Sequence, residues 1–113
     1  MKFLQRKANN RVSVIVIFHN MRREAARTLY SLSADYQEGI CKEDYEVLAV
    51  DSNSGNPLDS EMVTSYGSQF RYFSVSSPTP SPAKALNFAV EKARYNIVVL
   101  CIDGLITYII LRY

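Results

Sequence analysis

The sequence has few of the features that mark several common protein classes. It contains only two cysteines, Cys41 and Cys101, among its 113 residues. Two cysteines are too few for a disulfide framework, and by themselves they make no zinc site. The apolar runs at 12–18 and 105–113 are too short to span a bilayer. We therefore predict a cytoplasmic chain. For the apolar segment 105–113, two possibilities stay open, a folded strand or contact with a membrane.

Strong charge and phosphate-binding glycine patterns are also missing. Thirteen Lys and Arg residues against eleven Asp and Glu residues give a formal net charge of +2 at pH 7. This small excess does not indicate nucleic-acid binding. No Gly-x-Gly-x-x-Gly pattern or acidic pair follows the first apolar run, and no Gly-Lys-Ser/Thr occurs. The sequence thus disfavours a dinucleotide-binding or receiver-like domain.

The chain does contain a regular alternation of apolar runs and helical spacing. Apolar and alternating runs predict strands at 12–18, 45–50, 71–75 and 96–102. Helical spacing predicts helices at 21–36, at 58–66 and from residue 82 onward. Strands alternating with helices predict an α/β fold with a parallel sheet in one domain.

The same patterns predict which helix residues are buried. Asn20 is expected to be the N-cap of the first helix. The buried stripe of this helix is predicted to be Ala25, Leu29 and Leu32. The buried face of the last helix is predicted to be Ala83, Leu86, Val90 and Ala93.

Polar residues stand where three of the predicted strands end. The pairs are His19-Asn20, Asp51-Ser52 and Asp103-Gly104. In open α/β sheets, ligands bind beyond the carboxyl ends of the strands. We therefore expect Asp51 and Asp103 to follow two neighbouring parallel strands and to face one shared crevice.

Four segments resemble the family-2 glycosyltransferases of the GT-A fold. They are Val12-Ser-Val-Ile-Val-Ile-Phe-His-Asn20, Tyr45-Glu-Val-Leu-Ala-Val-Asp-Ser-Asn-Ser54, Ser81-Pro-Ala-Lys-Ala-Leu-Asn87 and Ile97-Val-Val-Leu-Cys-Ile-Asp103. Their order and spacing match the family up to Gly104, and residues 105–113 depart from it. The resemblance implies a Rossmann-like, mostly parallel sheet with helices on both faces. It also implies that 1–113 is a single partial domain, a truncated nucleotide-sugar-binding half.

The resemblance implies a transferase that binds a nucleoside-diphosphate sugar and passes the glycosyl group to an acceptor hydroxyl. Inversion and a divalent cation, Mg²⁺ or Mn²⁺, are the family's expected features. The carboxylate that serves as the family's base has no counterpart here, so no catalytic residue is assigned. We expect little or no transfer by this chain alone. A non-catalytic nucleotide-sugar-binding or interaction domain remains the alternative, and the base, sugar and acceptor stay open.

The resemblance also implies roles for single residues. Phe18, His19 and Asn20 match the loop that closes over the nucleoside. Asp51 matches the acid that recognises the base, and it is followed by Ser52 where the family often has a second acid. Lys84, near the start of a helix, matches a residue that favours the diphosphate.

For the cation, the resemblance implies Asp103 as the ligand, because it matches the final acid of the family's Asp-x-Asp motif. Cys101 stands in place of the first acid, so one carboxylate remains, and a thiol is a poor Mg²⁺ ligand. Structural alternatives stay open: Asp51 and Asp103 as turn formers, Lys84 as a solvated side chain and His19 as a surface histidine. The apolar segment 105–113 predicts an edge that seeks a partner or a second copy of the chain.

Overall fold

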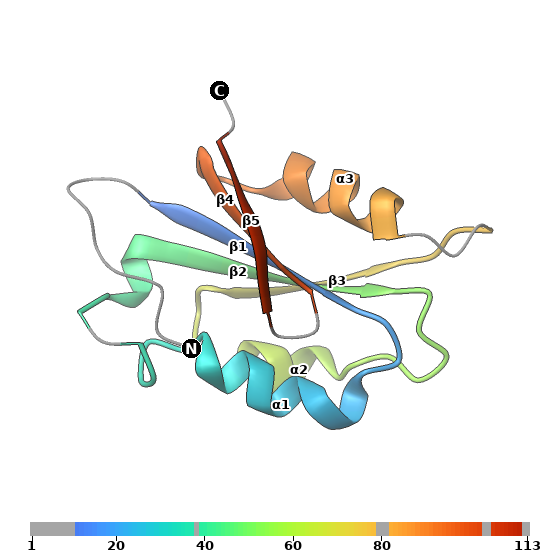
Figure 1. Cartoon of the computed structure of the whole chain (residues 1–113). Helices are drawn as coiled ribbons and strands as arrows, with labels where there is room; N and C mark the ends of the chain where they lie inside the picture. The colour runs from blue at the N-terminus through green and yellow to red at the C-terminus, as the bar shows by residue number, and fades with distance from the viewer. Residues whose placement is uncertain (1–10, 38, 79–81, 103–104, 112–113) are drawn as a thin grey trace.

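The computed structural model describes residues 11–37, 39–78, 82–102 and 105–111. Strands and helices alternate along these ranges, as the sequence predicts (Figure 1). The elements are β1 (Val12–Phe18), α1 (Arg22–Ser31), the short 3₁₀ helix η1 (Lys42–Asp44), β2 (Tyr45–Ser52), α2 (Ser60–Thr64), β3 (Phe70–Val75), α3 (Pro82–Lys92), β4 (Ile97–Ile102) and β5 (Leu105–Leu111).

The strands form one sheet in the order β3-β2-β1-β4-β5. The first four are parallel, and β5 runs antiparallel to β4. The predicted mostly parallel sheet is therefore confirmed. The expectation that Asp51 and Asp103 follow neighbouring strands is wrong, because β1 lies between β2 and β4. The connection through α3 returns the chain to the other side of β1, an order that apolar runs alone do not specify.

Helices cover both faces of the sheet, as expected (Figure 1). Alternate residues of β1 face opposite layers: Val14, Val16 and Phe18 join the core beneath α1 and α2, whereas Ile15 and Ile17 join the core beneath α3. This explains why the central strands are apolar almost without interruption, since each has two buried faces.

Helix α1 is shorter than the sequence predicts and begins without the expected cap. Its buried residues Ala25 and Leu29, and Leu32 just after it, confirm the predicted stripe. Its N-cap is Met21 and no side chain caps it, so the assignment of Asn20 as N-cap is wrong. Asn20 instead adopts a positive φ of 52°, a conformation that asparagine tolerates better than most residues.

Side chains from outside α1 bind the carbonyl groups at its end. The Gln37 amide donates to the Ser31 carbonyl at 2.7 Å, and the Tyr45 hydroxyl donates to the Leu32 carbonyl at 2.6 Å. Hydroxyls of Ser31 and Ser33 bond back to carbonyls three residues earlier. Serine side chains compete in this way with helical hydrogen bonding. The predicted continuation to Tyr36 is therefore wrong.

Helix α3 places a different stripe against the sheet than the sequence predicts. Ala85 and Ala89 are buried in the helix, and Ala93 is buried just after it, which confirms that one residue of the predicted face. Ala83 is exposed, and Leu86 and Val90 are only partly buried. The opposing sheet face carries bulky Ile and Leu side chains. A row of alanines lets the helix lie close against that surface, which a pattern based on hydrophobicity does not reveal.

Segment 105–111 forms the edge strand β5, next to β4. A folded strand was one of the two possibilities left open for this apolar segment. Across the described ranges, no helix has the length and hydrophobicity needed to cross a membrane.

Candidate functional site

The parallel strands end level with one another along one edge of the sheet, which we call the carboxyl rim. Phe18 at the end of β1 pairs with Asp51 of β2, and Asp51 pairs with Ser74 of β3. On the other side, Ile17 pairs with Ile102, the last residue of β4. The loops that follow β1 and β2 therefore begin at the same edge as the chain that follows β4.

Asp51 lies at this rim but is almost completely buried, with 1% of its surface exposed. Its Oδ2 accepts hydrogen bonds from the Leu58 backbone N–H at 2.6 Å and from the Tyr72 hydroxyl at 3.0 Å. Its Oδ1 accepts from the Ser54 hydroxyl. Both carboxylate oxygens are thus occupied by neutral donors of the chain itself, and they close the loop that runs from β2 to Leu58.

The loop after β1 is bonded to the loop after β2. The backbone N–H of Asn20 donates to the Ser54 hydroxyl oxygen at 2.9 Å, and the side-chain oxygen of Asn20 accepts from the Gly55 N–H at 2.8 Å. His19 approaches the Ser52 carbonyl with its Nδ1 at 2.7 Å. Residues 19–20 and 51–55 therefore form one hydrogen-bonded unit.

A second asparagine with positive φ extends this unit to β3. Asn53 has a φ of 50°. Its backbone N–H donates to the Val75 carbonyl at 2.9 Å, and its side-chain oxygen accepts from the Ser77 N–H at 2.7 Å. The ends of three strands are therefore held together by backbone and side-chain bonds.

Tyr72, on β3, supplies the hydroxyl that reaches Asp51. Burial is the larger cause, and the hydrogen bond to the charged Asp51 carboxylate adds to it; together they raise the pKa of Tyr72 to about 12. A tyrosinate here would be partly desolvated and would face a second negative charge. Tyr72 therefore stays a neutral donor across the physiological range of pH.

The remaining residues predicted for the site do not all reach this unit. Phe18 is buried in the core beneath α1 and α2, with 1% exposed, so its ring lies under the rim. Ser52 is buried and takes part through its carbonyl. Lys84 is exposed on α3, which covers the opposite face of the sheet from the core that contains Phe18. Asp103 lies outside the described residues.

The described donors do not fit a Mg²⁺ or Mn²⁺ ion held by the protein alone. Cys101, where the family has its first acid, is buried in the core with 1% exposed, and burial raises the pKa of its thiol to about 11. It is a neutral core side chain, and hard cations prefer charged oxygen. Within the ranges that the structure describes, no three His, Cys, Asp or Glu side chains gather as a metal site would require.

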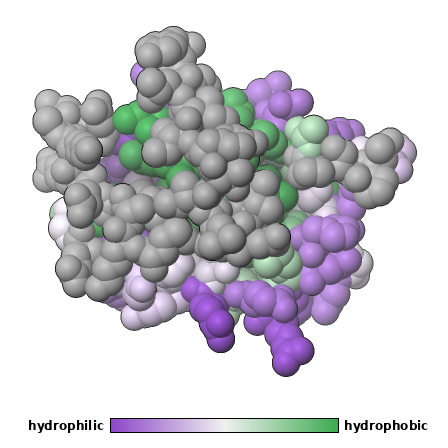
Figure 2. Space-filling model, in the orientation of Figure 1, coloured by the Kyte–Doolittle hydropathy of each residue, from purple (hydrophilic) through white to green (hydrophobic). Residues whose placement is uncertain are grey.

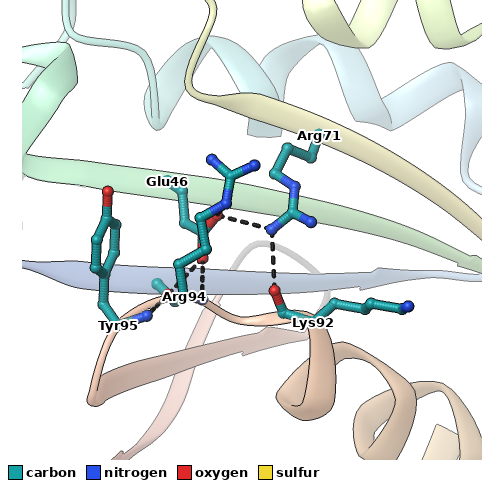
Figure 3. Close-up of polar contacts among 6 residues, drawn as sticks. Glu46, Arg71, Lys92, Arg94 and Tyr95 are labelled. Atoms are coloured by element: carbon teal, nitrogen blue, oxygen red, sulfur yellow. Dashed lines mark hydrogen bonds and ion pairs between the residues drawn. The ribbon is translucent and has the colours of Figure 1, made fainter.

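A second buried carboxylate, Glu46, lies near the amino end of β2 and was missed in the sequence. It is 2% exposed. It accepts from the Ser13 hydroxyl at 2.7 Å, from Arg71 at 2.9 Å and from the backbone N–H of Arg94 at 2.7 Å. Arg71 also donates to the Lys92 carbonyl at 3.0 Å (Figure 3). This network ties β1, β2 and β3 to the end of α3. The available signal was a glutamate inside a doubly buried strand, which requires a partner.

A hollow of about 330 Å³ lies beside the first turns of α1 and not across the carboxyl rim. Its lining residues are Met21, Arg23, Glu24, Arg27 and Thr28. Hydrophilic side chains gather over the layer of α1 and α2 in the face shown in Figure 2. Exposed arginines and a glutamate on one helix face are ordinary solvated surface, so we do not assign this hollow to the site.

The strand order and the rim place this chain among the open α/β domains that bind ligands beyond the carboxyl ends of their strands. Within that class, the chain belongs to glycosyl transferase family 2, because residues 13–104 match the sequence model of that family. The predicted family is therefore confirmed. The match ends before β5.

Comparison with solved structures supports the same fold. The crystal structure of S. aureus TarS 1-349 is similar with a TM-score of 0.60 and 21% identity. TarS 1-349 in complex with UDP is similar with a TM-score of 0.54 and 20% identity. Both matches cover 83% of this chain and 27% of the TarS chain. No curated protein matches the sequence significantly.

Proposed function

We propose that this chain binds a nucleoside-diphosphate sugar at its carboxyl rim, as the donor-binding part of a glycosyltransferase. The observation that carries the proposal is the bonded unit of residues 19–20 and 51–55, which stands beside the place where the strand order reverses between β1 and β4. Open α/β sheets bind nucleotides at such a place. The TarS structure that holds UDP makes UDP the first ligand to test.

The rim residues divide into those that face the ligand and those that hold them. Asn20 is exposed and offers polar groups to a nucleoside. Asp51 acts by closing the loop, because both of its oxygens are occupied. Ser52 contributes its carbonyl, and Phe18 forms the apolar floor beneath the rim.

The diphosphate is proposed to lie toward the start of α3. Lys84 is exposed in the first turn of this eleven-residue helix. The N-terminus of a helix carries partial positive charge, so it adds to the attraction that the ammonium group of Lys84 has for phosphate. Neither of these two features depends on a bound metal ion.

The expected Mg²⁺ or Mn²⁺ has only Asp103 as a proposed carboxylate ligand. Because Cys101 does not fit the ion, no step of the proposal passes through a cation. When it is bound, a divalent cation offsets charge on the leaving diphosphate.

In the proposed transfer, the oxygen of an acceptor hydroxyl attacks the anomeric carbon of the sugar. The bond from that carbon to the diphosphate oxygen breaks, and a base takes the hydroxyl proton. Asp51 does not suit the role of that base, because it is buried and already accepts three hydrogen bonds. This observation favours the second candidate function, a domain that binds a nucleotide sugar without catalysing transfer.

Calorimetric titration of the full chain with UDP, and then with GDP, tests the binding. We expect Lys84→Ala to weaken UDP binding by about tenfold, as the loss of a charge-assisted hydrogen bond does. Lys92→Ala, at the other end of α3, is the matched control and should leave the affinity within about twofold. If neither nucleotide binds, the proposed function is wrong.

Release of UDP from UDP-sugars in the presence of sugar acceptors separates the two candidates. Binding without turnover supports the non-catalytic domain. Robust transfer by this chain alone supports the enzyme and requires a base that the described rim does not reveal.

A further inference from the structure

Hydroxyl residues and prolines are concentrated in the connection between β3 and α3. This segment reads Ser76-Ser-Pro-Thr-Pro-Ser-Pro82, so it holds three of the four prolines of the chain, and each directly follows a serine or threonine. The fourth, Pro57, follows an asparagine. Proline by itself stiffens a connection, and that effect does not require a hydroxyl group before it. The pairing of hydroxyl with proline therefore gives this segment a chemistry that nucleotide binding does not use.

One of these pairs, Ser77-Pro78, lies within the described residues. It follows directly on the end of β3 and Ser76, and it belongs to neither a helix nor a strand. Ser76 and Pro78 are exposed, and Ser77 between them is half-buried. Proline disfavours helical backbone at the residue before it, which favours an extended backbone at Ser77. The pair thus lies in an extended and accessible stretch of chain.

A hydroxyl followed by proline in an extended segment is the substrate pattern of a proline-directed protein kinase. Proline has no backbone N–H, so it fits a pocket without an acceptor, where the N–H of any other residue is left unpaired at a cost. In the transfer, the serine oxygen attacks the γ-phosphorus of ATP. The bond from that phosphorus to the bridging oxygen of ADP breaks, and the hydroxyl proton passes to the catalytic aspartate of the kinase.

The backbone of Ser77 is bonded to the carboxyl rim. Its N–H donates to the side-chain oxygen of Asn53 at 2.7 Å, and Asn53 directly follows β2. The end of β3 and the start of α3 lie on the same side of the molecule in Figure 1. Helix α3 begins at Pro82, with Lys84 exposed in its first turn. A phosphate on Ser77 is therefore held at the rim and joined to Lys84 by a short connection.

A phosphate at this place opposes a bound diphosphate. Phosphoserine carries a charge of about −1.5 to −2 at pH 7. Asp51 already places a negative charge at the rim, and its donors within the described ranges are neutral. The short connection gives the phosphate a high effective concentration near Lys84. It repels the diphosphate of a nucleotide and competes with it for the Lys84 ammonium group.

We infer that Ser77 is a phosphorylation site for a proline-directed kinase, and that a phosphate there weakens nucleotide binding at the carboxyl rim. The acceptor assignment stands on Ser77 and Pro78 alone. The effect on binding rests on the proposed function, because it requires a diphosphate near Lys84.

Treatment of the full chain with ATP and a mitogen-activated protein kinase, followed by mass mapping, tests the acceptor. We expect phosphate at Ser77. Ser77→Ala should remove this phosphate, while Pro78→Ala keeps the hydroxyl, restores an N–H at the next residue and should slow phosphorylation of Ser77 at least about tenfold. Ser76→Ala is the matched control: Ser76 is exposed and is not followed by proline, so the rate should stay within about twofold.

Calorimetric titration with UDP measures the effect on binding. A chain that carries Thr79→Ala and Ser81→Ala keeps Ser77-Pro78 as its one hydroxyl-proline pair. Its phosphorylated and unphosphorylated forms then differ in a single group. We expect phosphorylation to weaken UDP binding at least about tenfold. Removal of the phosphate by a phosphatase should restore the affinity, which shows that the protein was not damaged.

Each result decides the inference. It is overturned if the kinase leaves Ser77 unmodified, if Pro78→Ala is phosphorylated as fast as the unmodified chain, or if the phosphorylated form binds UDP as tightly as the unphosphorylated one. In these cases UDP still binds to the unmodified chain, and the proposed function stands. If the unmodified chain binds neither UDP nor GDP, the proposed function and the effect on binding are both overturned, while a phosphate mapped to Ser77 still supports the acceptor assignment.

Discussion

Strand β2 carries two buried carboxylates, Glu46 near its start and Asp51 near its end, and they are held in different ways. Glu46 points to the α3 side and is paired with Arg71, with Arg94 at 3.9 Å as a second, exposed cation. Asp51 points to the other side, and its donors among the described residues are neutral, namely two hydroxyls and one backbone N–H. One carboxylate is thus compensated by cations, and the other is stabilised by dipoles alone.

The difference indicates what each carboxylate contributes. A buried ion pair loses most when one partner loses its charge, because the other charge is left uncompensated. A carboxylate bonded to neutral donors loses less, since hydroxyl groups can reverse their direction. The Glu46 network therefore serves the fold, while the Asp51 network shapes a loop at the rim and, within the part of the chain that the structure describes, pairs the negative charge with no cation.

Replacing each carboxylate by its amide sharpens this comparison, and Glu46→Gln should have the largest effect. We expect roughly 3 kcal/mol of lost stability, because Arg71 stays partly buried without its counter-charge. In addition, one end of the new amide must place its NH₂ group against a donor, since Arg71 and the Arg94 N–H cannot accept. Urea denaturation measures the loss.

Arg94→Ala is the control for this network. The Arg94 side chain is 64% exposed and lies 3.9 Å from Glu46, too far for a hydrogen bond. The backbone N–H of residue 94, which does bond to Glu46, remains in the variant. Its loss of stability should stay below about 0.5 kcal/mol. If Glu46→Gln were as mild as Arg94→Ala, the structural role of the ion pair would be refuted.

Asp51→Asn should have a smaller effect, about 1 kcal/mol. The amide oxygen can keep the hydrogen bonds from Leu58 and Tyr72, and the new NH₂ group can donate to the Ser54 hydroxyl. The same urea experiment, run beside Glu46→Gln, checks the ranking. An equal or larger loss for Asp51→Asn would show that the charge of Asp51, and not only its shape, holds the loop.

The sequence predicted the parts of the fold that local patterns determine. The runs at 12–18, 45–50 and 96–102 correspond to β1, β2 and β4 within a residue or two, because strands buried on both faces leave an unmistakable apolar signature. The end of α1 was not predictable in this way. Its last carbonyls are bonded by Gln37 and Tyr45, which lie beyond the helix in sequence.

The candidate site was predictable in location but not in its internal bonding. Strand ends followed by polar residues indicated the rim, and the structure brings Asn20, Asp51 and Ser54 together there. The burial of Asp51 depends on Tyr72 and Leu58, from a later strand and a later loop. The place of β1 between β2 and β4 likewise follows from the crossover through α3, which no single segment encodes.

Tyr72→Phe has the smallest expected effect at neutral pH, about 0.5 kcal/mol, since Asp51 keeps the Leu58 bond. This variant is informative because it changes how the stability of the chain depends on pH. Burial and Asp51 raise the pKa of Tyr72 from 10.0 to about 12 in the folded chain. Below pH 10 the phenol is neutral in both states, and its contribution to stability is fully present. As the pH rises from about 10 through about 12, the unfolded chain releases this proton while the folded chain retains it, so stability falls.

Phenylalanine has no proton to release, so the variant's stability should fall less steeply over the same range. Lysines and the remaining tyrosines, including Tyr45 with its raised pKa, titrate in both chains, and their contributions cancel in the difference. The neutral-pH advantage of the unmodified chain should therefore shrink and then reverse above pH 10, measured as urea midpoints at successive pH values. Parallel curves would mean that Tyr72 ionises as freely in the folded chain as in the unfolded one. The hydrogen bond from Tyr72 to Asp51 would then contribute nothing to the rim, and the contrast with the cation-paired Glu46 would have to rest on the Ser54 hydroxyl and the Leu58 backbone N–H.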